Sequence, residues 1–386
     1  MRCVAGRDWG ASSSALKRLY QALIGSVFDY GCVACGSAAP SVLRRLDVLQ
    51  SESLRVCCGA FKMSPVNALQ VEMGEMPLDL RRKQISVNYW VHLGGHGDAH
   101  PTKEVILECW EYGKSQKDHF GKVGNHWAKE CHVYDLKICP AVVFPVVPPW
   151  LLETPSVDWY LLDLKRKLKG RLDLVSAFQF HRLNEYPECI HVFTDGAKNL
   201  DNEITVFGIA VPSKNIGMNR CTSDGLAVYT VEMAAILVAL KWIEYSKIRQ
   251  VVVCSDSASV LSSLQSFCSK TRQDMLYNIL ETISRIRCSG VNIHFLWVPA
   301  HVGISGNEKV DRLAKGVLNK NRIEMEIKSR KSEAKGIVWR QVVKEWQKRW
   351  DSGSKGLGCI GVIGEKRWSL PGLDWVIVHY IKHYRW

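Results

Sequence analysis

The sequence contains no apolar stretch of the roughly 18 residues that a membrane-spanning helix needs. Its longest apolar run, Ala141 to Leu152, is interrupted by three prolines, which favour an extended linker over a helix. The N-terminal segment also lacks the uninterrupted apolar core of a secretory signal, because it contains Arg2, Arg7, Asp8, Lys17 and Arg18. We therefore expect an intracellular protein, cytoplasmic or nuclear, that is neither secreted nor attached to a membrane.

The 14 cysteines are scattered and do not form a recognisable disulfide framework. Without a secretory signal the compartment is expected to be reducing, so the thiols are expected to be free. Cys32 and Cys35 form a Cys-x-x-Cys pair, but Cys57 and Cys58 are adjacent and lack the usual spacing of zinc ligands. A zinc site is therefore formally open but not expected.

Positive charge exceeds negative charge, with a formal net charge of +13 and an isoelectric point of about 9.1. A basic protein gains affinity for nucleic acid by displacing condensed counterions, so a polyanionic partner is expected. Residues 320–350 contain ten Lys or Arg against four Glu. A second basic segment contains Lys165, Arg166, Lys167, Lys169 and Arg171. Either segment alone could be a solvated helix face. Because the two segments flank a group of acidic residues on both sides, we expect them to contact the backbone of a duplex.

Two aspartates, Asp195 and Asp256, stand in the same local setting. Each follows a run of apolar residues and precedes small residues, a pattern typical of a buried strand that ends in a turn. Carboxylates at the carboxyl ends of strands point into a shared crevice. Either aspartate alone could be a turn residue or a helix cap, so the prediction of a site depends on their combination with further acids.

Glu232 lies in the segment Val231 to Ile243, in which Lys241 is the only other charged residue. A helix that is apolar nearly all round is expected to be buried against a sheet. Burying a carboxylate there is unfavourable unless a positive group compensates it. Mg²⁺ or Mn²⁺ would do so, since these cations prefer oxygen ligands and make neighbouring carboxylates mutually compatible.

Asp311 supplies a fourth carboxylate. It follows a Gly-rich loop, Pro299 to Asn307, that carries His301, and it lies in a helix expected to begin at Asn307 and Glu308. A histidine on a loop is suited to proton transfer or to product release. Two cations about 4 Å apart can activate water and stabilise the leaving oxygen in an in-line attack on phosphorus. The four acids and His301 therefore predict a metal-dependent nuclease.

The order of these motifs resembles the ribonuclease H domain of non-LTR retrotransposon polyproteins of the jockey-like type. The resemblance covers residues 186–320, from TDGAK through the helix with Glu232 and the SDSAS strand to PAHVGISGNEKVDRLAK. Further strands are expected at residues 205–212, about 220–229 and 291–298. The implied fold is α/β, a ribonuclease H-like mixed five-stranded sheet flanked by helices and preceded by a mainly α-helical region.

The resemblance also implies which residues act. Asp195, Glu232, Asp256 and Asp311 would hold two Mg²⁺ ions, with Mn²⁺ as an alternative, and His301 would be the auxiliary base. The implied substrate is an RNA–DNA hybrid duplex whose RNA strand is cut to leave 3′-hydroxyl and 5′-phosphate ends. Residues beside the carboxylates are candidate contacts to the nucleic acid: Gly196, Ala197, Lys198, Ser257 and Asn307.

Residues 8–84 resemble the segment that follows the reverse-transcriptase catalytic region in the same elements, so an upstream reverse-transcriptase polypeptide could be a partner. No Tyr-x-Asp-Asp turn, which carries polymerase metals, occurs in the sequence, so the chain is not expected to synthesise DNA.

The expected regions are 1–135, a mainly helical remnant; 136–185, a Pro-containing linker and basic segment; 186–320, the nuclease; and 321–386, a basic helix and a Gly/Ser-containing tail. One helix face is expected to bury Leu16, Leu19, Tyr20, Leu23 and Val27.

Two other functions stay open on the sequence alone. The chain could be a catalytically inactive nucleic-acid-binding relic of the same element, although all four acids are present. A transposase or integrase shares the fold and uses three acids for DNA strand transfer. Glu232 on the first helix, together with the loop that carries His301, favours a ribonuclease over strand transfer.

Overall fold

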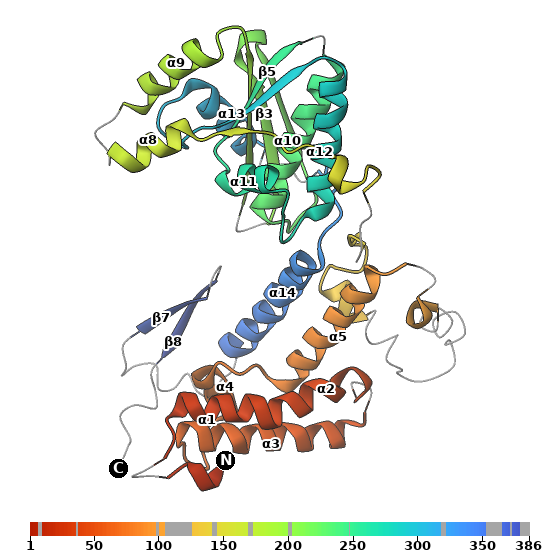
Figure 1. The fold of residues 1–386 in the computed structure, drawn as a ribbon. Coiled ribbons are helices and arrows are strands. Elements are labelled where there is room, and N and C mark those ends of the chain that lie inside the picture. Colours follow the sequence, from red (N-terminus) through yellow and green to blue (C-terminus); the bar gives the residue numbers. More distant parts are fainter. Residues whose placement is uncertain are drawn as a thin grey trace. The chain divides into compact units, whose positions relative to one another are not determined.

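A computed structural model describes residues 1–6, 10–35, 38–97, 100–104, 126–140, 145–168, 173–199, 203–246, 248–317, 322–352, 365–370 and 373–378. The chain forms two compact units, one of Met1–Ile138 with Ala334–Trp386 and one of Cys139–Glu333. Figure 1 shows the elements of both units. Among the helices in these ranges, none has the length and apolar character that crossing a bilayer requires.

The unit Cys139–Glu333 is built on a mixed sheet with the strand order β1-β6-β5-β2-β3-β4. Strands β1, β6, β5 and β2 run parallel to one another, and β3 pairs antiparallel with β2 and β4. The mixed α/β sheet that the sequence predicts is therefore confirmed, and a two-residue strand, β1, adds a sixth member beside β6. The strands are β1 (Val157–Asp158), β2 (Ile190–Lys198), β3 (Thr205–Val211), β4 (Ile216–Cys221), β5 (Gln250–Ser255) and β6 (Asn292–Trp297).

Helices cover both faces of this sheet (Figure 1). Gly196 of β2 faces helix α10 (Val228–Tyr245), whereas Gly208 of β3 faces helix α13 (Ser305–Lys315). Gly196 pairs with Phe207, the neighbour of Gly208, and successive strand residues point to opposite faces. Helices α10 and α13 therefore lie on opposite sides of the sheet. Helices α11 (Ala258–Ser266) and α12 (Gln273–Cys288) both pack against α10.

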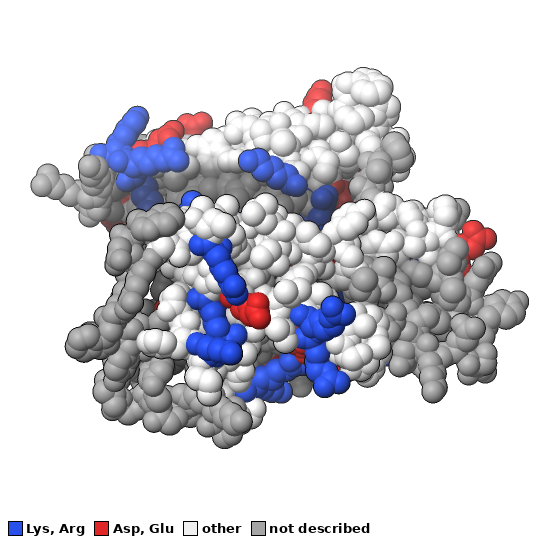
Figure 2. All heavy atoms as spheres, turned by 90° about the horizontal axis from the view of Figure 1, so that it is seen from below, with Lys and Arg blue, Asp and Glu red and all other residues white. Residues whose placement is uncertain are grey.

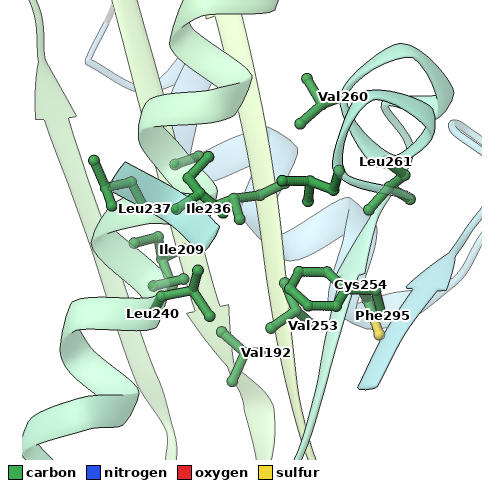
Figure 3. Close-up of a cluster of buried hydrophobic side chains, with 14 of the residues drawn as sticks. Val192, Ile209, Ile236, Leu237, Leu240, Val253, Cys254, Val260, Leu261 and Phe295 are labelled. Atoms are coloured by element: carbon green, nitrogen blue, oxygen red, sulfur yellow. The ribbon is translucent and has the colours of Figure 1, made fainter. Parts of the chain in front are cut away.

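Helix α10 is buried because it is apolar nearly all round, as the sequence predicts. Figure 3 shows Ile236 and Leu240 of this helix beside Val192, Ile209 and Val253 of the sheet. All five side chains have 0% exposure, so the helix and the sheet form one continuous core. Each buried aliphatic side chain of this kind contributes about 1.5–3 kcal/mol relative to an exposed one. This packing holds α10 against the sheet.

The hairpin between β3 and β4 is tighter than the sequence predicts. A 3₁₀ turn (Pro212–Lys214) and Asn215, whose φ is 52°, reverse the chain within four residues. Asparagine is among the few non-glycine residues that adopt this left-handed conformation readily. Strand β4 therefore occupies Ile216–Cys221, and the expected strand at residues 220–229 is wrong: most of that segment is the loop that leads into α10.

The segment before β2 contains ordered elements that belong to the same compact unit. Helices α8 (Tyr160–Leu168) and α9 (Leu174–Glu185) follow β1. Asp158 at the end of β1 is hydrogen-bonded to the Nε2 atom of His181 at 2.6 Å, and it accepts a hydrogen bond from the hydroxyl of Tyr186 at 2.9 Å. These contacts tie α9 and the chain after it to the edge strand. Residues 141–144 of the expected extended run lie outside the described ranges.

The other unit is mainly helical in its described residues. Leu16 and Tyr20 are buried there, but Leu19, Leu23 and Val27 are exposed, so the single buried face predicted for these five residues is wrong. A π-helical turn (Gln21–Gly25) follows Tyr20 and shifts the helical register, which moves Leu23 and Val27 off the face that buries Leu16 and Tyr20. The helices are α1 (Ser13–Tyr20), α2 (Ser26–Cys35), α3 (Pro40–Cys58), α4 (Val66–Met73), α5 (Leu78–Gly94) and most of α14 (Lys331–Ser352); β7 (Glu365–Leu370) and β8 (Leu373–Val378) form a hairpin.

The excess of basic residues is visible on the molecular surface. The face drawn in Figure 2 shows more Lys and Arg than Asp and Glu among its coloured side chains. Within the unit Cys139–Glu333, Lys165, Arg166 and Lys167 form an exposed turn at the end of α8. The expected basic residues Lys169 and Arg171 lie outside the described ranges.

Candidate functional site

Asp195 lies inside a strand and not at its end. The sequence predicts a turn after Asp195, whereas β2 continues to Lys198 because it remains paired with β3. The parallel pairing of β2 with β5 stops one residue earlier, at Thr194 opposite Ser255. Asp256 is the next residue after β5. The two aspartates are therefore placed side by side where the parallel part of the sheet ends.

Gly196 allows α10 to approach β2 closely at this point. A Cβ atom on Gly196 would lie 2.8 Å from the backbone nitrogen of Glu232 and 3.0 Å from its Cγ atom. Such short distances are not tolerated, so only glycine permits this contact. The glycine of the TDGAK motif thus brings the Glu232 side chain over the strand next to Asp195.

Ser257 and Asn307 hold two of the carboxylates through hydrogen bonds. The Ser257 hydroxyl donates a short hydrogen bond to Oε2 of Glu232, and the Asn307 side-chain amide donates to Oδ2 of Asp256 at 3.4 Å. Both donors are buried, with exposures of 6% and 3%. The carboxylates are therefore oriented by neutral donors, which leave their negative charge uncompensated.

Trp297 also supports this site, although no local pattern in the sequence indicates such a role. Its indole Nε1 donates a hydrogen bond to the backbone carbonyl of Asp256 at 3.0 Å. Trp297 is the last residue of β6 and lies opposite Ser255 of β5. The register between these two strands, which the sequence does not specify, is what places the indole beside Asp256.

Burial and mutual repulsion raise the pKa values of the central carboxyl groups. Burial, together with repulsion from Asp256 and Asp311, raises the pKa of Asp195 to about 7. Burial raises the pKa of Glu232 to about 7 although the Ser257 hydrogen bond opposes the shift. Burial also raises the pKa of Asp256 above its ordinary value, against the hydrogen bond from Asn307. Asp195 therefore interacts electrostatically with Asp256, Asp311 and Glu232, and that these four acids form one metal-binding quartet stays a prediction.

Asp311 and Glu308, both on α13, lie close to His301 on the preceding loop. One ligand atom from each of the three lies within 4.8 Å of the others. Helix α13 begins at Ser305, two residues earlier than the sequence predicts. Asp311 is paired with Lys315, one turn further along, at 2.9 Å. Glu308 and Lys315 are thus additional residues at the site, and their spacing from Asp311 on one helix is the signal that could have revealed them.

The candidate contacts to nucleic acid are mostly engaged inside the protein. The Lys198 ammonium group pairs with Glu203 at 2.6 Å and donates to the Leu226 carbonyl at 3.1 Å, and its side chain is only 11% exposed. Gly196, Ser257 and Asn307 support Glu232 and Asp256 as described above. Ala197 is half-buried on β2 and packs at the edge of a small cluster with Val206.

The four acids offer the type of donor that hard divalent cations prefer, since carboxylate oxygens such as those of Asp195, Glu232, Asp256 and Asp311 bind Mg²⁺ and Mn²⁺. Among the described residues, however, the group whose ligand atoms lie within 4.8 Å of one another consists of His301, Glu308 and Asp311. Burial and repulsion disfavour ionisation of three of the four acids in the protein alone. A bound cation would remove that penalty, because it makes neighbouring carboxylates compatible.

The raised pKa values predict that the metal-free protein loses stability as the pH rises. The unfolded chain ionises Asp195 near its ordinary pKa, so the stabilisation is present at acidic pH and is lost as the pH rises through about 7. We expect unfolding with EDTA to occur at least about 4 °C lower at pH 8 than at pH 6, for a cost on the order of 2 kcal/mol. Saturating Mg²⁺ should restore stability at pH 8, as measured by thermal denaturation.

Asp195→Asn separates this effect from other titrations in the chain. Asparagine stays neutral at both pH values, so the variant should be more stable than the unmodified protein at pH 8 in EDTA and should respond less to Mg²⁺. An unchanged difference between pH 6 and pH 8 in this variant would show that Asp195 is not the group responsible.

Comparison with protein families agrees with this geometry. The family model described as RNase H matches residues 187–319. The match includes Asp195, Glu232, Asp256, Asp311 and His301, and it covers strands β2 to β6 and helices α10 to α13. Residues 187–319 therefore match an RNase H domain, and the N-terminal region of the chain is helical in its described residues.

Proposed function

We propose that the RNase H domain is a metal-dependent endonuclease that hydrolyses the RNA strand of RNA–DNA hybrids. The observation that carries this proposal is that Asp195, Glu232 and Asp256 are buried carboxyl groups with raised pKa values, and that Asp195 and Asp256 both interact electrostatically with Asp311. Buried carboxylates that stabilise a fold are normally paired with cationic side chains. Here Ser257 and Asn307 are neutral, so the arrangement disfavours the charged form unless a cation is bound, as a metal site does.

The four carboxylates would hold two Mg²⁺ ions, or Mn²⁺, which would activate water and stabilise the leaving oxygen. The ion pair between Lys315 and Asp311 would break readily and free the carboxylate for a cation, since the lysine side chain is 55% exposed and an exposed ion pair is weak. His301 is exposed on its loop, where it would transfer a proton or assist product release. The expected products carry 3′-hydroxyl and 5′-phosphate ends.

We propose that the basic turn of α8 contacts the backbone of a duplex near this site. The Lys165 ammonium group lies 5.9 Å from the ring centroid of Trp297, the residue that bonds to the Asp256 carbonyl. Exposed Arg166 and Lys167 continue the same turn. Phosphate contacts carry no base information, so we propose slight sequence preference, with the RNA strand distinguished by its 2′-hydroxyl groups.

We further propose that this nuclease acts as part of a non-LTR retrotransposon protein, with an upstream reverse-transcriptase polypeptide as its partner. The support for this context is the resemblance of residues 8–84 and 186–320 to consecutive parts of such proteins. The alternative is that the chain is an inactive nucleic-acid-binding relic of the same element.

Cleavage of a labelled hybrid by the full chain tests the proposed activity. We expect Mg²⁺-dependent cutting of the RNA strand, no cutting in EDTA, and no cutting or strand joining of a DNA duplex of the same sequence. Binding of the hybrid without cleavage, in either Mg²⁺ or Mn²⁺, would support the relic and would refute the enzyme. Cutting or joining of the DNA duplex would instead indicate a strand-transfer enzyme.

A further inference from the structure

The loop that carries His301 has a strained backbone. Between β6 and α13, His301 has a φ of 55° and Gly303 a φ of 94°, so two of its residues are left-handed. A non-glycine residue adopts this region uncommonly and at an energetic cost, although histidine does so more often than most, so neighbouring groups hold the conformation. The question is therefore which group fixes the loop.

Glu308 is bonded directly to this loop. Its Oε1 atom accepts a hydrogen bond from the backbone nitrogen of Gly303 at 3.3 Å. Glu308 lies in the first turn of α13, where the helix dipole favours a negative side chain, and its backbone carbonyl accepts a hydrogen bond from Arg312. The carboxylate is thus anchored to a rigid helix and restrains a left-handed residue two positions after His301.

Glu308 also lies beside the groups that the loop serves. Its carboxylate, the His301 ring and the Asp311 carboxylate each place an atom within 4.8 Å of the other two. Glu308 and Asp311 are three residues apart on α13 and therefore share a face of the helix. One side chain consequently links the position of His301 to that of a proposed metal ligand.

We propose that Glu308 is a positioning residue that holds the loop in the conformation in which His301 acts. This inference rests on the proposed nuclease function and extends it: Glu308 works through His301 by accepting the Gly303 N–H. The role requires an oxygen acceptor at this position and not a negative charge. Glutamine in place of Glu308 should therefore preserve the position of the loop, whereas alanine should not.

Steady-state cleavage by Glu308→Ala, Glu308→Gln, His301→Ala and the double variant Glu308→Ala/His301→Ala tests the proposal. We expect Glu308→Ala to lower kcat about tenfold or more with little change in KM, and Glu308→Gln to retain most of the activity. The double variant should be no slower than His301→Ala, since both changes remove one function. Multiplied losses in the double variant, or a Gln variant as slow as the Ala variant, would overturn the proposal.

Glu281→Ala is the matched control. Glu281 also accepts backbone N–H groups with its carboxylate, from Val146 and Val147 at 2.9 and 3.2 Å, but it is not one of the site residues. Its loss should leave kcat unchanged.

Hydrogen exchange at the Gly303 amide gives a readout that does not depend on catalysis. Exchange should be faster in Glu308→Ala and close to normal in Glu308→Gln. Failure of the unmodified chain to cut hybrids would refute the proposed function. The exchange rate would still test the hydrogen bond between Gly303 and Glu308. Unchanged exchange in the alanine variant would refute the positioning role even in an active enzyme.

Discussion

Asp256→Asn is expected to abolish Mg²⁺-dependent cleavage of RNA–DNA hybrids, with a loss of about a thousandfold or more in kcat. The amide has nearly the same shape as the carboxylate, so the fold should persist. It carries no charge, however, and one of its two polar atoms donates hydrogen bonds and cannot bind a cation. Asp256 follows β5 directly, beside the point where the parallel pairing with β2 ends next to Asp195, so the change would remove one of the proposed metal ligands.

The same variant should make the metal-free protein more stable. Burial raises the pKa of Asp256, so the charged form is disfavoured in the fold and a neutral amide removes that cost. Loss of activity combined with a higher unfolding temperature in EDTA would identify a functional carboxylate. Loss of activity caused by misfolding would lower the unfolding temperature instead.

Glu244→Gln provides the control for this experiment. Glu244 lies on α10 like Glu232, but it is part of an ion pair with Arg285 at 2.7 Å near the other end of the helix. Its neutralisation should leave cleavage unchanged. If Asp256→Asn cleaved as fast as Glu244→Gln, the proposed mechanism would be wrong.

The fold was largely predictable because its strands and helices carry strong local patterns. The apolar segment Val231 to Ile243 is too uniformly hydrophobic to be anything but buried, and it forms the core of α10. Elements whose boundaries depend on their partners were less predictable. Strand β2 extends past Asp195 because β3 offers it a hydrogen-bonding edge, and no residue in the TDGAK motif signals this.

The candidate site shows the same division between local and long-range information. Each of the four acids has a recognisable setting in the sequence, which is why they could be singled out. Trp297 could not, because its role depends on the register of β6 against β5. Lys198 is the opposite case. The sequence suggests a free cation, whereas the structure pairs it with Glu203.

Gly196→Ala is expected to damage both stability and activity. The added methyl group would meet the backbone nitrogen of Glu232 at 2.8 Å, and neither the strand nor the buried helix α10 can move without disturbing the core. Overpacking of this kind costs about 1–3 kcal/mol. Any relief must displace the start of α10, and with it Glu232, away from Asp195. We therefore expect a lower unfolding temperature and a fall in kcat of at least about tenfold.

Gly217→Ala tests whether this effect is specific to the site. Gly217 lies in β4 of the same sheet, and its added methyl group would meet the Cδ1 atom of Leu313 at 2.9 Å. A terminal methyl on a flexible side chain can rotate away, whereas a backbone nitrogen in a buried helix cannot. The Gly217 variant should thus lose less stability and keep its activity. Equal losses in the two variants would mean that the sheet tolerates no added volume and that Gly196 has no special role in placing Glu232.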